Sequence, residues 1–216
     1  MSTLKLWAIS IDEVRSIFRA EPPLADQLRQ AARERFGTSG QQQPGLLGKL
    51  GPFLRNGGDP AAPRPGVPNA EDVDNLLSGR FVPPHRLVEA WNLLDFWLDT
   101  LAAGSGRWPL TEGGLNEFDF DLVRAEVSAR YGLSELFKAN LGISLTRCGG
   151  LAAGWVSGSH AQGMRQAWPD RLDELSPAHR EFAEAIIEFL AHFEEWNSAA
   201  EAAGRAHPDL VAIFRS

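Results

Sequence analysis

Hydrophobic residues recur along the chain with two different periods, which predicts a mixture of strands and helices. Weak alternation over Leu4–Ile9 indicates a first strand, and the apolar run DLVAIF at residues 209–214 indicates a last one. Two short strands are expected in the middle of the chain, at Ile143–Thr146 and Gly154–Ser157. The pattern therefore predicts a small sheet formed by N-terminal, middle and C-terminal strands.

Between these strands the apolar positions are spaced three and four residues apart, as on one face of a helix. A first helix is expected after Ser10 and before Pro22. The other expected helices are Leu24–Phe36, Ala70–Leu77, His85–Ala103, Glu117–Ala129, Ser134–Asn140 and Ala161–Trp168. The longest pattern starts at Ser176, the expected N-cap, and continues to near Gly204. Residues 108–110 are interpreted as a short connection. Because strands and helices do not alternate strictly, we predict an α+β fold in which several helices, including a long C-terminal helix, pack on the sheet.

The chain of 216 residues is expected to form a single domain, residues 1–216, with a loop insertion at about 38–69. Glycine, proline and glutamine dominate this stretch, around an apolar island that includes Phe53. Such a composition does not sustain a helix, because proline lacks the backbone N–H and glycine costs backbone entropy. A loop of this length is either functional or disordered, and both alternatives stay open.

Charge and cysteine usage narrow the class of protein. The 28 acidic residues outnumber the 21 basic ones, giving a formal net charge of -7, which argues against nucleic acid or an anionic membrane as the partner. The single cysteine excludes an intrachain disulfide, and no apolar signal segment or spanning segment is evident. We therefore expect a cytoplasmic protein with no membrane association and no cofactor.

One candidate for chemistry is Cys148, which lies in TRCGG, with His160 in the following SGSH. In a nucleophilic site Cys148 would attack, His160 would act as the base, and Arg147 or Arg165 would bind an anion. The alternative is structural, because a lone cysteine is more often a small buried residue. The two readings differ in whether Cys148 and His160 share one cleft.

A second candidate is the polar face of the last helix. Its members are spaced to share one side: Glu181, Glu184, Glu188, His192 and Glu195. Glu188 and His192 are one turn apart, but a metal site needs at least three ligands. We therefore expect a solvated acidic face and no metal site.

The aromatic composition is unusual, with seven tryptophans and a single tyrosine. On the helix His85–Ala103, Trp91 belongs to the apolar stripe whereas Trp97 is rotated away from it. A tryptophan off the stripe indicates either a second packing surface or, if exposed, a contact site for a partner.

Three segments together resemble an uncharacterised group of small bacterial proteins of unknown function. They are DVDNLLSGRFVPPHRLVEAWNLLDFWLDTLA, LTRCGGLAAGWVSGSHAQ and the final helix running into DLVAIFRS. More distantly, the plan of a strand–helix start, a middle helix containing AW and a helix–strand end is similar to the YfbM-like family. The resemblance covers about two-thirds of the chain and omits the 38–69 loop. It implies a compact mixed helix–strand domain with no established activity, and it transfers no catalytic residue.

These observations favour a non-catalytic cytoplasmic protein-interaction module, immunity-like or regulatory, that binds a basic protein. The expected contact residues are Trp97, Phe53, Glu188, His192 and Arg165. A homodimer is compatible with this reading. The alternative is a small-molecule-binding protein or enzyme with Cys148 and His160 in one cleft.

Overall fold

The computed structural model describes residues 2–37, 65–111 and 113–216, and these fall into two compact units. Of the described residues, unit 1 comprises those within 2–16, 98–143 and 147–216, and unit 2 those within 17–97 and 144–146. The expected loop insertion, apart from residues 65–69, lies outside the described residues. The expectation of a single domain stays a prediction.

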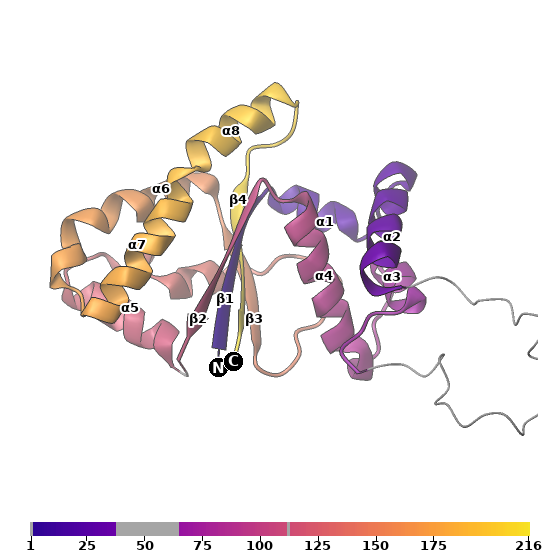
Figure 1. Cartoon of the computed structure of the whole chain (residues 1–216), viewed down its shortest axis with the longest axis horizontal. Coiled ribbons are helices and arrows are strands. Elements are labelled where there is room, and N and C mark those ends of the chain that lie inside the picture. Colours follow the sequence, from indigo (N-terminus) through magenta and orange to yellow (C-terminus); the bar gives the residue numbers. More distant parts are fainter. Residues whose placement is uncertain (1, 38–64, 112) are drawn as a thin grey trace, which may run out of the picture. The chain divides into compact units, whose positions relative to one another are not determined.

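An antiparallel sheet forms the centre of unit 1 (Figure 1). In the described residues it has four strands in the order β2-β1-β4-β3. Their bounds are β1 Ser2–Ile9, β2 Gly104–Leu110, β3 Leu151–Val156 and β4 Asp209–Arg215. The N- and C-terminal strands are neighbours, with Leu6 opposite Ala212. The predicted α+β fold, with a sheet built from N-terminal, middle and C-terminal strands, is confirmed.

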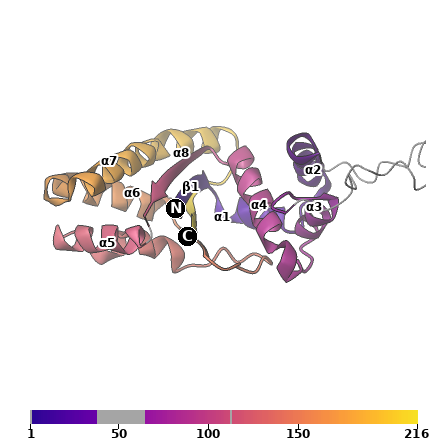
Figure 2. The same cartoon turned by 60° about the horizontal axis from the view of Figure 1, so that its bottom comes forward.

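Helices cover one face of this sheet, where α5, α6 and α7 gather on the same side (Figures 1 and 2). The helices of unit 1 after β2 are α5 Gly114–Arg124, α6 Gly158–Ala167, α7 Pro177–Ala191 and α8 Phe193–Ala202. Every second residue of β1 points into the core between the sheet and these helices. This core includes the buried apolar residues Leu4, Leu6, Ala8, Phe118, Met164, Ile186, Phe193 and Ala212. Each large side chain buried here contributes roughly 1.5–3 kcal/mol.

Two predictions for the middle of the chain are corrected. Residues 104–110, expected to end a helix and start a connection, form β2, although two glycines and Pro109 lower their strand propensity. Pairing with β1 at one side only makes β2 an edge strand, where proline is tolerated. Residues 143–146 are not a strand. Of the two short strands expected in the middle of the chain, the second is present as β3, which starts earlier than expected.

The expected C-terminal helix is present, with a break at His192 that separates α7 from α8. Ser176 occupies the N-cap position of α7, but its side chain makes no capping hydrogen bond. Its backbone N–H instead donates to Asp121 of α5 at 2.9 Å. The residue that starts this helix is therefore held by a side chain distant in sequence.

Unit 2 is helical in its described residues. It contains α2 Pro22–Phe36, α3 Ala70–Leu77, the short 3-10 helix Pro84–Arg86 and most of α4 Leu87–Leu101. The helix α1 Ile11–Ile17 belongs to unit 1 except for its last residue. A capping box starts α3, because Asn69 and Asp72 exchange hydrogen bonds of 2.8 and 2.9 Å. Arg86 binds the buried Asp72 through two of its nitrogens and so ties the start of α4 to α3.

Candidate binding site

Trp97, expected as a contact residue, is part of the core of unit 2. Its side chain has no exposed surface, and its indole N–H donates to the carbonyl of Leu28 at 3.1 Å. A buried tryptophan with its single donor satisfied has no group left for a partner. The choice of Trp97 as a surface contact is therefore wrong, and the alternative of a second packing surface is correct.

The structure does not bring Cys148 and His160 together. Cys148 lies in the turn before β3, next to the C-terminal end of the chain, where the N–H of Ser216 bonds to Gly150. His160 lies in the first turn of α6, beyond the other end of β3. The six residues of β3 span about 20 Å at roughly 3.3 Å per residue. At this separation Cys148 and His160 cannot form the hydrogen bond that a nucleophile–base pair requires.

The remaining predicted contacts are dispersed. The five residues of the acidic face on α7 and α8 are all exposed, as expected, with Nδ1 of His192 at 3.5 Å from Glu195. Arg165 of α6 pairs with Glu194 at 3.1 Å and so is not positioned beside Cys148 as an anion anchor. Arg147 donates to the carbonyl of Ala153 at 2.6 Å. Phe53 lies outside the described residues.

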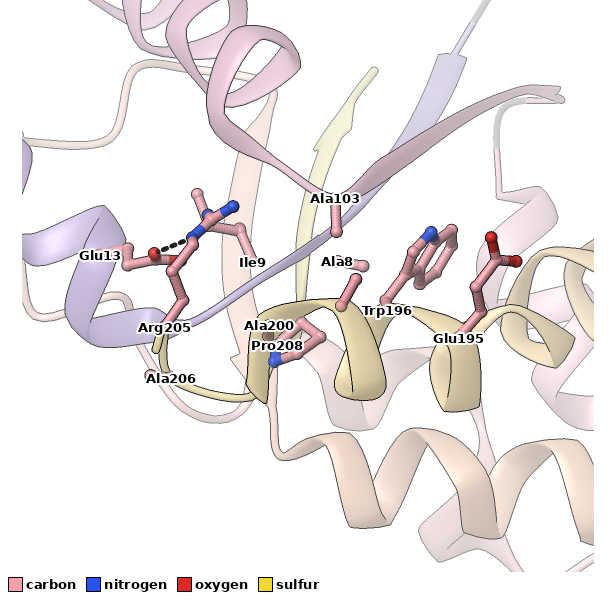
Figure 3. Close-up of a pocket in the computed structure, with 11 residues that line it drawn as sticks. Ala8, Ile9, Glu13, Ala103, Glu195, Trp196, Ala200, Arg205, Ala206 and Pro208 are labelled. Atoms are coloured by element: carbon pink, nitrogen blue, oxygen red, sulfur yellow. Dashed lines mark hydrogen bonds and ion pairs between the residues drawn. The ribbon is translucent and has the colours of Figure 1, made fainter. Parts of the chain in front are cut away.

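A pocket of about 340 Å³ opens in unit 1, and sequence reasoning did not anticipate it. Its walls come from the end of β1, from α1, from the residue before β2, from α8 and from the segment joining α8 to β4. Most of the lining is small and apolar, consisting of Ala8, Ile9, Ala103, Ala199, Ala200, Ala206 and Pro208. The other lining residues are Trp196, Glu13, Glu195 and Arg205 (Figure 3). We call this cavity the Trp196 pocket.

The indole of Trp196 is held in place by its neighbours. It packs against the rings of Phe189, Phe193 and His192, with ring centroids 5.1, 5.4 and 5.6 Å away. It also covers Gly104, where a Cβ atom would lie 2.1 Å from Cζ2 of the indole, so only glycine fits beneath the ring. The side chain is partly exposed, and its N–H has no acceptor among the described residues. The pocket thus has a fixed aromatic wall with a free donor.

An ion pair closes the other side of the Trp196 pocket. Nε of Arg205 donates to Glu13 at 2.8 Å, and a second guanidinium nitrogen donates to the other oxygen of Glu13 at 3.1 Å and to the carbonyl of Leu101 at 3.2 Å. The bond with Glu13 raises the pKa of Arg205, so the guanidinium stays charged. Gly204, with φ of 64°, ends α8 and turns the chain so that Arg205 reaches Glu13.

These features define what the Trp196 pocket can bind. Figure 3 shows the Glu13–Arg205 pair on one side of the alanines and Trp196 with Glu195 on the other. The positive charge of Arg205 is already compensated by Glu13, so Glu195 leaves the lining with one net negative charge. An apolar floor, an aromatic wall and an excess carboxylate together suit an apolar stem that ends in a cation.

Asp209, next to the pocket residue Pro208, fixes the elements around it. Its carboxylate accepts the N–H of Ile11 at 2.9 Å and that of Gly158, so it joins the starts of α1 and α6 to β4. Burial raises the pKa of Asp209, although these two backbone donors act in the opposite direction. The residue holds structure together rather than facing a ligand.

A second pair of titratable residues joins α5 to α7. Nδ1 of His179 lies 2.8 Å from the buried carboxylate of Asp121, which also binds Arg124 at 2.7 Å. The ring of His179 packs edge-on against Phe118. Because Asp121 also accepts the N–H of Ser176 at the start of α7, this pair serves the packing of the two helices.

The rest of the described structure adds no further candidate site. The described His, Cys, Asp and Glu side chains include no set of three positioned to hold a metal ion. Within the described ranges, every helix is too short or too polar to span a lipid bilayer. Comparison with family models, with curated proteins and with solved structures finds no match for this chain.

The residues of the Trp196 pocket were missed for a definite reason. Trp196 continues the apolar stripe of the last helix, so the periodicity predicts that it is a core residue. Glu13 and Arg205 are 192 positions apart, and no local pattern pairs them. The one signal of this site in the sequence was that Glu195, a member of the acidic face, directly precedes a tryptophan.

Proposed function

We propose that this chain is a cytoplasmic protein-interaction module that binds a basic segment of another protein through the Trp196 pocket. The observation that carries the proposal is the composition of that pocket, which combines an apolar floor, a partly exposed indole and an excess carboxylate. Tryptophans in interface pockets are among the residues that contribute most to protein–protein affinity. An immunity-like or regulatory role, in which a basic surface of the partner is covered, is the form of this function we favour.

The acidic face extends the proposed surface beyond the pocket. Glu195 belongs to both, and the exposed side chains of Glu181, Glu184 and Glu188 continue along α7. With a formal net charge of -7 on the whole chain, this face attracts a basic partner and repels phosphate backbones. Charges of this kind raise the association rate more than the affinity, so binding is expected to weaken as salt is added.

The size of the site sets the kind of complex that is expected. A pocket of about 340 Å³ accommodates one side chain rather than a protein surface. Stable interfaces bury roughly 1,200–2,000 Å² in total, so a contact confined to this pocket fits a transient complex with a short segment. A homodimer stays a prediction, and so does the resemblance to the YfbM-like family, which contributes no activity to the proposal.

Display of random peptides tests the proposal. The wild-type chain and the variant Trp196→Leu are used as bait in parallel, and the recovered peptides are sequenced. We expect lysine- and arginine-containing peptides to be enriched on the wild type, and the enrichment to fall on the variant and in high salt. Recovery of peptides with no excess of basic residues would rule out the proposed function.

A second candidate function is supported by the volume of the same pocket. Sites for small molecules start at roughly 300 Å³, and they are concave and mostly apolar with few polar groups. A small cation with an apolar body would then be the ligand, and Cys148 and His160 would play no part in binding it. Thermal unfolding in the presence of a panel of small amines distinguishes the two, because a specific ligand raises the unfolding temperature as its concentration rises.

A further inference from the structure

We propose that the Trp196 pocket receives a single arginine side chain of the partner. The methylene stem would lie on the alanine floor, and the guanidinium would stack on the Trp196 ring with its edge toward Glu195. This inference rests on the proposed function and adds to it the residue that the pocket recognises.

The floor of the pocket suits a narrow aliphatic stem. Ala8, Ile9 and Ala200 are buried, and the other floor residues are alanines and one proline. Such side chains leave space that a larger residue would fill, and they offer no polar group to the stem. Arginine and lysine both bury their methylene groups along surfaces of this kind while their charge stays near water.

The aromatic wall selects for a planar cation. The contacts with Phe189, Phe193 and Gly104 fix the plane of the Trp196 ring before any ligand arrives. Tryptophan is the strongest aromatic acceptor for a cation, and a guanidinium stacks on it with less loss of hydration than an ammonium. The indole N–H, which has no acceptor among the described residues, is available for a backbone carbonyl of the same segment.

The charges of the lining point the cation toward Glu195. Arg205 would repel an incoming guanidinium, but both oxygens of Glu13 and the carbonyl of Leu101 already bind it. Glu195 is largely exposed, with 77% of its side chain accessible, and its ion pair with His192 is long at 3.5 Å. The Glu195 carboxylate can therefore turn toward a new partner, and it stands beside the Trp196 ring (Figure 3).

The inference is tested with a labelled peptide, acetyl-Gly-Ala-Arg-Ala-Gly-amide, titrated against the chain by fluorescence polarisation. Matched peptides carry citrulline, which has the shape of arginine without its charge, or lysine. The protein variants are Trp196→Leu, Glu195→Gln and the control Glu201→Gln, which makes the same charge change on α8 outside the pocket. Unfolding curves of each variant check that it folds.

We expect the arginine peptide to bind the wild type more tightly than the lysine peptide does. Replacing Trp196 by leucine should weaken binding about three- to thirtyfold, because the cation–π contact is lost. Glu195→Gln should weaken it about two- to fivefold, as for an exposed ion pair, and Glu201→Gln should leave it unchanged. Citrulline in place of arginine should have an effect at least as large as Glu195→Gln.

Three results would overturn this inference. One is equal affinity for the arginine and citrulline peptides, which uses only the wild-type chain and so does not depend on variant folding. Another is arginine-dependent binding that Trp196→Leu and Glu195→Gln leave unchanged, which would keep the proposed function but move the site elsewhere. The third is no binding of the arginine peptide at millimolar concentration while the display experiment still enriches basic peptides.

Discussion

Substitution of Asp121 tests how strongly the contacts between α5 and α7 stabilise unit 1. The residue is 6% exposed, and its carboxylate accepts the N–H of Ser176, while the Nδ1 atom of His179 lies 2.8 Å from the same oxygen. Hydrogen bonds to a charged group contribute about 1.5–3 kcal/mol each. Because His179 is 25% exposed, water replaces part of its bond after a substitution. We therefore expect Asp121→Ala to lower the free energy of unfolding by about 2–4 kcal/mol, and Asp121→Asn, which keeps one acceptor, by about 1–2 kcal/mol.

The effect should depend on pH in a defined direction. Burial by itself would raise the pKa of Asp121, but the bonds from Ser176 and His179 and the charge of Arg124 outweigh it and hold the pKa below its ordinary value. The stabilisation by Asp121 is then fully present above the ordinary aspartate pKa of about 3.9 and is lost as the pH falls through the folded-state value. The deficit of Asp121→Asn should therefore be largest near neutral pH and shrink in acid.

Urea unfolding followed by circular dichroism at neutral and acidic pH measures these differences. The control is Glu117→Gln, an exposed acid on α5, which should change the free energy of unfolding by less than about 0.5 kcal/mol. An Asp121→Asn variant as stable as the control at neutral pH would refute the reasoning. So would a deficit that grows as the solution becomes acidic.

Three further predictions concern other parts of the fold. Trp97→Phe should cost about 1–3 kcal/mol in urea unfolding, because the hydrogen bond from the indole to the carbonyl of Leu28 is lost and the smaller ring leaves space in the core, whereas less than about 0.5 kcal/mol would mean that Trp97 is a surface residue. Asn69→Ala should cost about 1 kcal/mol and lower the thermal midpoint, because the capping box of α3 is lost. An unchanged midpoint would show that the cap does not contribute. Asp209 should act oppositely to Asp121, since burial raises its pKa and its stabilisation, complete below the ordinary aspartate pKa, is lost as the pH rises through the folded-state value. Asp209→Asn should therefore gain stability relative to the wild type from acid to neutral pH, and a relative loss over that range would contradict this.

Local pattern was sufficient for most of the elements. The helical spacing over Ala70–Leu77, the apolar run at residues 209–214 and the helical pattern that starts at Ser176 each predict a structure that the chain adopts. These signals depend on residues that are neighbours along the chain, so they can be read without the fold. The α+β class follows from their order alone.

The strand β2 and the role of Trp97 depended on partners distant in sequence. Residues 104–110 have a weak strand propensity, and their pairing with β1 makes them a strand. The helical spacing correctly placed Trp97 off the stripe of Trp91, but its burial depends on the packing of unit 2 and on the carbonyl of Leu28. Periodicity gives the direction of a side chain, whereas the tertiary structure decides what covers it.

The pocket of the candidate site likewise depends on residues distant in sequence. The sequence alone determined the acidic face and the net charge of the chain, because helical spacing and composition do not depend on the fold. Only the tertiary structure placed Trp196 over Gly104, and only it set Arg205 against Glu13. A pocket is the space that packed elements leave between them, so it exists only where residues far apart in the chain come together.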